Sequence, residues 1–574
     1  MPIAGPAGLG YTPEPHIGGV EPSAFAEVVM TRPRSLGPLL LLAAALVLLL
    51  VVTPGSAQGP PTGQGSQTPK YGGVLVSSPI GAPPSLSPHE EATIGTVAQA
   101  SACFNNLVYF DAGKKQESAD TIVPELAEKW SWQDNYRNLV FFLRKGVRWH
   151  DGKPFTAQDV KYTFDMVRGA PDAKGKLRVN PRKLWYENVE AVEAPESHTV
   201  VFRLKRPQPS LLPMLASGYS PIYPAHVPVA EFKTRCVGTG PFKLKEYKPG
   251  EYVEYVKNPD YFVKGRPYLD GIKFVIIRDR STQIAALQAG QLDEAGSGWN
   301  QANAETAKAG APKLSMLVAE SGVNDNVLVN FKRPPFTDPR VRRAINLALD
   351  RKAYVVGPRQ GAATFGGAML PRPAGVWGLP AAEVAKLPGM GDAARQKAEA
   401  RKLLAEAGFG PGNPLKLTVS TRAIAIYVDT ASWMVDQLQR VGIDATLEQI
   451  ETGVWHPKMT RLEYQVALNL TGLGIDDPDA NFFENFKCGS PRNYSGYCSE
   501  EIDRLVAEQS QVLDRAKRAK LVHEIDMKLQ LDGARPILGW GRQYSLHWPH
   551  VKNWVQHNNS IYNQSRLQDV WLDK

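Results

Sequence analysis

The stretch NLVFFLRKGVRWHDGKPFTAQDVKYTFDMV, residues 138–167, holds a strand, a turn and a helix in direct succession. Its first part, through Trp149, is dense in leucine, valine and aromatic residues, which favour a β-strand. Asp151 and Gly152 follow, and both residue types tolerate the positive φ of a tight turn. This part of the stretch therefore predicts a strand over residues 138–149 that ends in a turn.

The second half of the stretch has the pattern of an amphipathic helix. Thr156 is placed as the N-cap, and Asp159 follows as a capping-box partner. Val160, Phe164 and Val167 recur at helical spacing and form one apolar face. We therefore predict a helix that begins after Thr156 and packs this face into a core.

His150 and Asp151 raise the alternative of a catalytic pair. Such a pair must direct both side chains at one substrate atom, whereas the side chains of adjacent turn residues usually diverge, so we interpret both as turn residues. The chain has no GxSxG, HExxH or GxxxxGK[ST] motif, and VGTGPF at 237–242 lacks the third glycine of a dinucleotide loop and predicts a tight turn at a strand entry. We expect no enzymatic activity, no cofactor and no metal site.

Further along the chain, strand and helix patterns alternate. LKLTVST (415–421) and DATLEQI (444–450) favour strands, and DTASWMVDQLQRVGI (429–443) between them favours a helix. YQVALNLTGLG (464–474) favours another strand. This alternation is typical of βαβ units and a largely parallel sheet. We also predict helices over about 93–107 and through 499–528.

Size and charge narrow the class of protein. A chain of 574 residues is too long for one core, so more than one domain is expected. Hydrophobic residues make up 43% and charged residues 21%, as in a globular protein. The net charge of +9 is mild, and the basic residues are interleaved with acidic ones, which does not favour nucleic-acid binding.

The N-terminal region has the layout of an exported protein. An apolar run at 36–52 lies between Arg32/Arg34 and the small residues Gly55-Ser56-Ala57, which predicts a secretory signal peptide. Translation is expected to begin at Met30, residues 1–57 form the leader and signal peptide, and 58–70 form a flexible linker. Export to the periplasm follows, with an uncleaved membrane anchor as the alternative.

The chain has four cysteines, which export would place in an oxidising compartment. Cys488 and Cys498 enclose a loop rich in turn formers, so a local disulfide is predicted there, with two free thiols as the alternative. Cys103 and Cys236 are candidates for a second pair, although sequence does not decide connectivity.

The run DDPD, Asp476–Asp479, follows the end of a predicted strand, where ligands commonly bind in α/β folds. Its carboxylates are candidates for binding a cation or an ammonium group. Capping of the loop is the alternative.

Several segments, in order, resemble the extracytoplasmic solute-binding proteins of ABC transporters, in the family that handles peptides and nickel. The opening stretch with PELAEKWSW (124–132) before it resembles the signature of that family. The later landmarks are VGTGPFKL (237–244), NPDYF (258–262), PPFTDPRVRRAINLALDR (334–351), ARKLLAEAGF (400–409), DPD (477–479) and NYSGYCSEEID (493–503).

The resemblance implies an α/β, two-lobed periplasmic-binding-protein-like fold with a hinge and an extra subdomain in the first lobe. Lobe I would hold 71–322, with the extra subdomain at about 105–235, and would regain 542–574. Lobe II would hold 323–541. The implied activity is capture of a small-molecule or peptide-like solute by hinge closure, and delivery by a monomer to an ABC permease in the inner membrane.

The resemblance also implies candidate ligand-binding residues. Relatives lay a peptide along a strand of lobe II, hold its carboxylate with an arginine and hold its ammonium with an aspartate. The ammonium position falls on Gly474, so a free peptide N-terminus would lack a counter-ion unless Asp476 or Asp477 reaches it. The candidates are Ser87, Trp299, Asn300, Arg422, Leu470, Thr471, Gly472, Asp476 and Asp477.

Two other functions compete with solute binding. One is an exported hydrolase acting on peptides or esters, and the other is a chaperone-like peptide-binding protein. A nucleophile paired with a base would favour the hydrolase, and none is evident in the sequence.

Overall fold

A computed structural model describes residues 68–296, 298–558 and 566–574. The predicted leader and signal peptide, and most of the predicted linker, lie outside the described residues. No helix in the described ranges combines the length and the apolar character needed to cross a bilayer.

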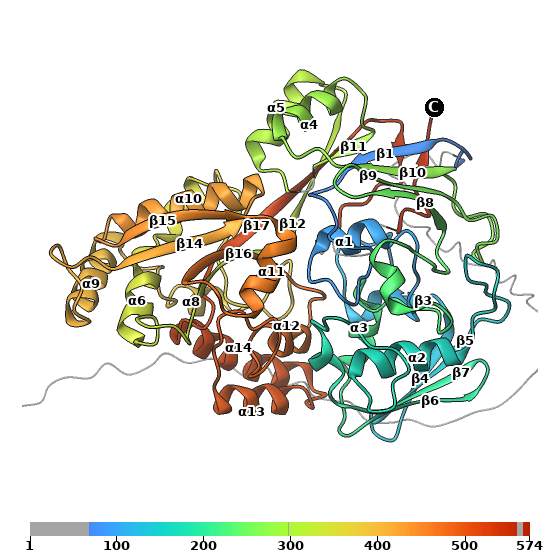
Figure 1. Cartoon of the computed structure of the whole chain (residues 1–574), viewed down its shortest axis with the longest axis horizontal. Coiled ribbons are helices and arrows are strands. Elements are labelled where there is room, and N and C mark those ends of the chain that lie inside the picture. Colours follow the sequence, from blue (N-terminus) through green and yellow to red (C-terminus); the bar gives the residue numbers. More distant parts are fainter. Residues whose placement is uncertain (1–67, 297, 559–565) are drawn as a thin grey trace, which may run out of the picture. The chain divides into compact units, whose positions relative to one another are not determined.

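One large mixed sheet organises the described chain (Figure 1). In spatial order its strands are β15 (Asp444–Ile450), β14 (Lys416–Arg422), β16 (Val466–Gly472), β12 (Ser315–Val329), β17 (Ile537–His547), β11 (Glu294–Ala295), β1 (Val74–Ser78), β10 (Gly271–Val275), β9 (Tyr252–Lys257) and β8 (Phe242–Lys248), with β13 (Ala363–Thr364) beside β17.

Smaller sheets lie outside this path. One contains β4 (Ala127–Gln133), β5 (Asn138–Leu143), β7 (Thr199–Leu204) and β6 (Val189–Glu196). The others pair β2 (Val108–Phe110) with β3 (Ile122–Pro124), and β18 (Val551–Lys552) with β19 (Trp571–Leu572).

The helices fall between these strands. They are α1 (Ile94–Ala100), α2 (Ala157–Arg168), α3 (Leu211–Ala216), α4 (Arg280–Gln288), α5 (Gln301–Gly310), α6 (Pro339–Ala348), α7 (Arg351–Val356), α8 (Ala381–Val384), α9 (Ala393–Glu406), α10 (Ala425–Gln439), α11 (Thr452–Thr460), α12 (Pro478–Asn485), α13 (Glu500–Gln509) and α14 (Arg515–Leu531). Short 3₁₀ turns are η1 (Ala119–Thr121), η2 (Lys183–Tyr186) and η3 (Val229–Lys233).

The predicted βαβ region is confirmed. β14 pairs in parallel with both β15 and β16, and α10 connects β14 to β15. β16 then pairs antiparallel with β12, which joins this parallel part to the rest of the sheet. The carboxyl ends of β14 and β15 consequently lie at one edge, where α/β folds commonly bind ligands.

β12 and β17 are long antiparallel strands that continue through both parts of the large sheet (Figure 1). At one end they pair with each other beside β16, and at the other end β17 pairs with β11. Their register shifts between Glu320 and Asn324. A shift of this kind bends a strand pair locally.

The segment 138–167 forms a strand, a turn and a helix, as predicted. Thr156 and Asp159 form the capping box of α2, and Gly169 ends the helix in the left-handed region at φ 70°. The strand is shorter than predicted: β5 ends at Leu143, because the chain turns at Gly146, where φ is 77°. Two other predictions need similar correction, since α1 ends at Ala100 and the region 499–528 is two helices.

His150 and Asp151 have diverging partners. The His150 side chain is partly buried, with Nε2 3.0 Å from the carbonyl oxygen of Gly240, and desolvation lowers its pKa to about 4. Asp151 instead has its Oδ2 2.6 Å from Nε2 of His226. The two side chains serve separate contacts, as expected of turn residues.

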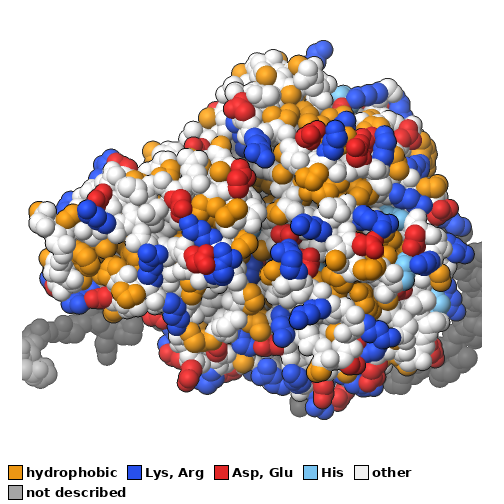
Figure 2. Space-filling view, in the orientation of Figure 1, with side chains coloured by type: hydrophobic (Ala, Val, Ile, Leu, Met, Phe, Trp, Pro, Cys, Tyr) orange, Lys and Arg blue, Asp and Glu red, His pale blue; other side chains and the backbone are white. Residues whose placement is uncertain are grey.

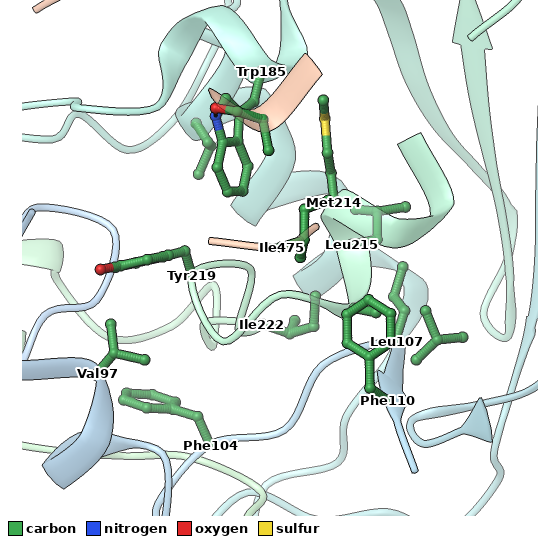
Figure 3. Close-up of a cluster of buried hydrophobic side chains, with 14 of the residues drawn as sticks. Val97, Phe104, Leu107, Phe110, Trp185, Met214, Leu215, Tyr219, Ile222 and Ile475 are labelled. Carbon is green, nitrogen blue, oxygen red and sulfur yellow. Dashed lines mark hydrogen bonds between the residues drawn. The ribbon is translucent and has the colours of Figure 1, made fainter. Parts of the chain in front are cut away.

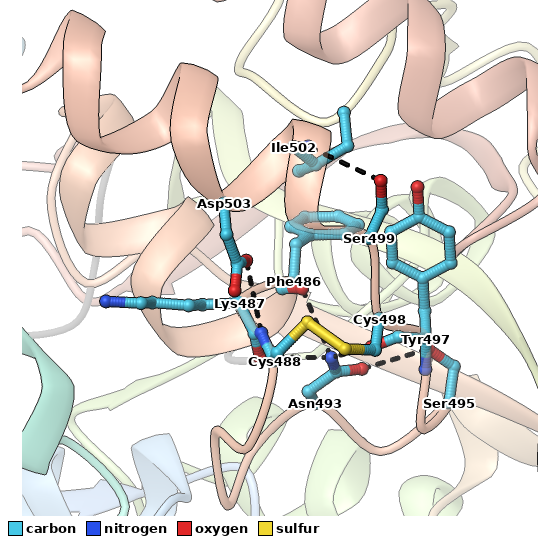
Figure 4. Close-up of a disulfide and its surroundings, with 10 residues drawn as sticks. All are labelled: Phe486, Lys487, Cys488, Asn493, Ser495, Tyr497, Cys498, Ser499, Ile502 and Asp503. Atoms are coloured by element: carbon cyan, nitrogen blue, oxygen red, sulfur yellow. Dashed lines mark hydrogen bonds between the residues drawn. A yellow bond between two sulfur atoms is a disulfide. The ribbon is translucent and has the colours of Figure 1, made fainter.

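Both candidate cysteine pairs form disulfides. Cys488 and Cys498 close the short loop shown in Figure 4, and Cys103 pairs with Cys236 across 133 positions. Gly238 and Gly240 of the VGTG segment lie directly against the backbone of Cys103, and a Cβ on Gly238 would fall 1.9 Å from its carbonyl oxygen. These glycines therefore serve a close approach of two backbones.

The surface in Figure 2 shows basic and acidic side chains interleaved, with apolar side chains between them. This distribution is the one expected from the sequence.

Candidate functional site

A cavity lies beside the carboxyl end of β14, where segments distant in sequence meet. Its walls come from the residues after β1 and β11, the start of α1, the central parts of β12 and β17, and the ends of β14 and β16. The start of α10 and a residue of α11 also contribute, as do Tyr219, Arg359 and Arg492. An enclosed space at the end of parallel strands is the usual place for a small ligand.

Four of the predicted ligand-binding residues line this cavity: Trp299, Arg422, Leu470 and Gly472. Leu470 and Gly472 lie in β16, whose Asn469 also contributes to the wall. Trp299 is 1% exposed, and its indole Nε1 donates to Gln283 at 2.6 Å. It therefore contributes to the core and to the cavity wall at once.

Three other candidates lie outside the lining of this cavity. Thr471 is buried, and its hydroxyl accepts a hydrogen bond from Asn326 at 2.9 Å. Ser87 is fully buried, with its hydroxyl 3.1 Å from that of Tyr223. Asn300 caps α5, where its side chain accepts from the backbone N–H of Asn303. Each of these side chains is engaged in a local structural contact.

Asp476 and Asp477 also lie away from this cavity. Asp477 caps α12 and pairs with Arg518 at 2.8 Å. Asp476 accepts from the backbone N–H of Val376 at 2.9 Å, and burial raises its pKa to about 7. Loop and helix capping, the alternative for this run, is what the structure shows.

Gly474 is packed against an indole. A Cβ added there would lie 2.7 Å from the Trp185 ring, and Tyr219 is the next neighbour. Figure 3 shows Trp185 and Tyr219 close to Ile475, on the segment that follows Gly474. The space that a larger side chain would need is therefore occupied by aromatic residues from the 105–235 region.

Arg422 is the most informative residue of the site. It is 8% exposed at the end of β14, and its guanidinium donates to the hydroxyls of Thr452 (2.8 Å), Tyr427 (2.9 Å) and Thr93 (3.5 Å). None of these partners is charged. A buried guanidinium that lacks a carboxylate carries a large desolvation cost, which a ligand anion would offset.

Three further arginines line the cavity, and each has a carboxylate partner. Arg359 donates to Asp325 at 3.1 Å from Nε, Arg492 lies 3.1 Å from Glu484, and Arg542 lies 3.2 Å from Glu320. The described residues that line the cavity include no aspartate or glutamate.

Four residues of the cavity wall were not predicted from the sequence: Arg359, Arg492, Arg542 and His456. Burial and the nearby Arg422, Arg492 and Arg182 hold the pKa of His456 well below its usual value, so its imidazole is neutral. These residues stand on four separate elements or loops, and no local motif marks them.

Comparisons with known proteins find similarity to solute-binding proteins. A curated relative, the probable di/tripeptide-binding protein 5 of Pseudomonas aeruginosa, is 29% identical over 75% of this chain and 82% of its own length. Among solved structures, the Bacillus subtilis oligopeptide-binding protein AppA in complex with a nonapeptide has a TM-score of 0.76 at 24% identity, covering 88% of this chain and 100% of AppA.

AgaA of A. tumefaciens R10, solved with agropinic acid, has a TM-score of 0.75 at 22% identity, covering 88% of this chain and 99% of AgaA. Residues 121–493, well over half of the chain, match the family described as bacterial extracellular solute-binding proteins, family 5. The chain therefore belongs to family 5 of the bacterial extracellular solute-binding proteins.

Proposed function

We propose that this protein is the periplasmic solute-binding component of an ABC import system, and that it delivers its solute to a permease in the inner membrane. The observation that carries this proposal is the cavity itself, which is lined from both sides of the β12–β17 connection and contains the uncompensated Arg422. A signal peptide in residues 1–57 would export the chain, and 58–70 would link it to the folded part.

The strand connections support a division of the chain into two lobes. Lobe I comprises 71–322, including the extra subdomain at about 105–235, and 542–574, while lobe II comprises 323–541. The register shift between Glu320 and Asn324 falls at the boundary that we propose. Bending of β12 and β17 there would open and close the cavity.

Capture works by hinge closure on a solute that touches both lobes. Only contacts made in the closed form shift the equilibrium toward closure. A ligand of micromolar affinity supplies about 8 kcal/mol, part of which offsets the cost of closure. Hydrogen bonds between the proposed lobes, such as Arg492 to the carbonyl oxygen of Ala92 at 2.6 Å, contribute to the closed form.

The solute is peptide-like or carries a carboxylate. Arg422 would pair with the carboxylate through two parallel N–H donors. Leu470 and Gly472 would lie along the ligand, and Trp299 would present its ring to it. Ser87, Asn300 and Thr471 would act from behind the wall by fixing the backbone of the segments around it.

The test is isolation of the natural ligand. The mature protein, purified from its own cell envelope, is expected to release a small molecule that native mass spectrometry detects as a mass difference. Small-angle X-ray scattering of the stripped protein with and without that molecule should show a smaller radius of gyration with it. Superimposable curves, or release of the molecule in a cleaved form, would refute capture by closure; sedimentation should show a monomer in both states.

A further inference from the structure

The charges of the cavity are unbalanced. Arg422 has hydroxyl partners only, and the acidic partners of Arg359, Arg492 and Arg542 stand behind the wall. Glu484 is moreover shared: Arg492 lies 3.1 Å and Arg182 3.6 Å from its carboxylate. All three of these residues are buried. One carboxylate thus faces two guanidiniums beside the uncompensated Arg422, which leaves an excess of positive charge.

One aromatic face of the cavity wall, that of Tyr219, is already covered by a cation. The Arg182 guanidinium lies 3.1 Å from the ring centroid of Tyr219, a residue of the cavity wall. A cation over this face is stabilised by the ring, so a ligand ammonium that used the Tyr219 ring would have to displace Arg182 from both Tyr219 and Glu484. Displacing Arg182 from Glu484 would break a buried ion pair, which carries a large free-energy cost.

A carboxylate cannot be supplied from the neighbouring strand end either. Gly474 has no side chain, and the Trp185 ring occupies the place of any Cβ there. Asp477 is held by Arg518 and by its cap on α12, and Asp476 is held by Val376. Within the described chain, none of these groups offers an ammonium a counter-ion at the cavity.

We propose that the cavity takes an organic acid that presents a carboxylate to Arg422 and carries no free ammonium group. This inference rests on the proposed solute-binding function and narrows it. A ligand of this kind offsets the excess positive charge and leaves the Arg182–Glu484–Tyr219 arrangement intact. A dipeptide with a free amino terminus would place a third cation beside Arg182 and Arg422.

Three probes built on alanyl-alanine test the carboxylate and the ammonium group of a ligand separately. N-acetyl-alanyl-alanine has the carboxylate without the ammonium, alanyl-alanine has both, and alanyl-alaninamide has the ammonium alone. In calorimetric titrations of the stripped, full mature protein, the acetylated probe is expected to bind at least tenfold more tightly than alanyl-alanine. Alanyl-alaninamide is expected to show no heat of binding.

The natural ligand gives a second test, which does not depend on the side chains of the probes. It is the molecule released from protein purified from its own cell envelope. An acid that does not react with an amine-specific label supports the inference. An amine-bearing peptide, or alanyl-alanine binding as tightly as its acetylated form, overturns the inference and leaves the proposed function standing. If no molecule is released and no probe binds, the proposed solute-binding function fails, and the inference fails with it.

Discussion

The Nη2 atom of Arg422 lies 3.5 Å from the hydroxyl of Thr93, a residue 329 positions earlier in the chain. Arg422 ends β14, and Thr93 caps α1. Arg492 donates to Ala92, the neighbour of Thr93, so two guanidiniums meet the same short segment. The proposed closure of the two lobes therefore has its contacts at the place where the ligand would bind.

Replacement of Arg422 should weaken binding of the released ligand without unfolding the protein. In Arg422→Gln the charge is lost, and affinity is expected to fall by about 10- to 100-fold, the range for a charge-assisted hydrogen bond. Arg422→Lys keeps the charge but loses the planar, two-donor geometry of the guanidinium. Its ligand affinity should therefore lie between those of the native protein and Arg422→Gln. Isothermal titration calorimetry measures the effect, with the exposed Arg440→Gln as the control. Unchanged affinity in Arg422→Gln would remove this residue from the site.

Gly474→Ala should destabilise the protein by about 1–3 kcal/mol, the usual cost of overpacking a filled core. The reason is the Trp185 ring, 2.7 Å from where the Cβ would be. Chemical denaturation of this variant and of Gly412→Ala, whose Cβ would meet nothing within 4 Å, gives the comparison. Equal midpoints for the two variants would contradict the packing described here.

Asp477→Asn should lower stability and leave ligand affinity unchanged. Asp477 pairs with Arg518 in a buried network outside the cavity. Asp479 stays beside Arg518 at 3.2 Å, so the loss of the charge-assisted hydrogen bonds of Asp477 should cost about 1.5–3 kcal/mol. Thermal melting measures the first effect, and titration at a temperature where the variant is folded measures the second. A loss of affinity without a loss of stability would return Asp477 to the list of ligand-binding residues.

The Glu294→Gln variant should gain stability relative to the native protein as the pH rises: the difference in their free energies of unfolding should shift in favour of the variant. Burial raises the pKa of Glu294 from 4.5 to about 7, although its carboxylate accepts hydrogen bonds from Ser77 and Ser545. Between these two pH values the unfolded chain releases the proton while the folded chain keeps it, so the native protein loses stability as pH rises through this window.

The variant has no such titration, so its advantage should grow from pH 4.5 to 7, by on the order of 2–3 kcal/mol, and level off above that. Thermal melts of both proteins from pH 4 to 9 provide the measurement. A difference that stays constant with pH would show that Glu294 does not titrate in this way.

The two disulfides should differ in their contribution to stability. In the chain-entropy account, a bond that closes a longer loop restricts the unfolded chain more. The Cys103–Cys236 bond spans 133 positions and the Cys488–Cys498 bond spans 10. The double Ser variants of each pair should therefore lose about 4–5 and about 2–3 kcal/mol. Denaturant titrations of both variants test the order, and the reverse order would show that native-state effects dominate.

The local parts of the fold could be predicted because each depends on neighbouring residues. The capping box of Thr156 and Asp159, the turn at Asp151 and the alternation of strands and helices over 415–474 all rest on short-range patterns, and the structure has each of them. Element ends were predicted less well. β5 and α1 both end early, because the tertiary path of the chain decides where a strand or helix stops.

The site divides in the same way. Arg422, Leu470 and Gly472 lie in recognisable strands, so the resemblance to a family could locate them. Asp476 and Asp477 follow a strand end too, but their side chains turn to Arg518 and to backbone donors instead of the cavity. Position after a strand does not determine direction, because the direction is set by what the neighbouring elements leave open.

The amino-acid sequence by itself determined the family, the strand and helix pattern and the absence of recognisable catalytic motifs, since these depend on the order and spacing of residues. Only the tertiary structure brought Thr93, Arg492 and Tyr219 into one cavity with Arg422 and placed the Trp185 ring against Gly474. The charge balance of the cavity is a sum over residues hundreds of positions apart. Electrostatic interaction depends on distance in space and on burial, and neither quantity is present in a linear sequence.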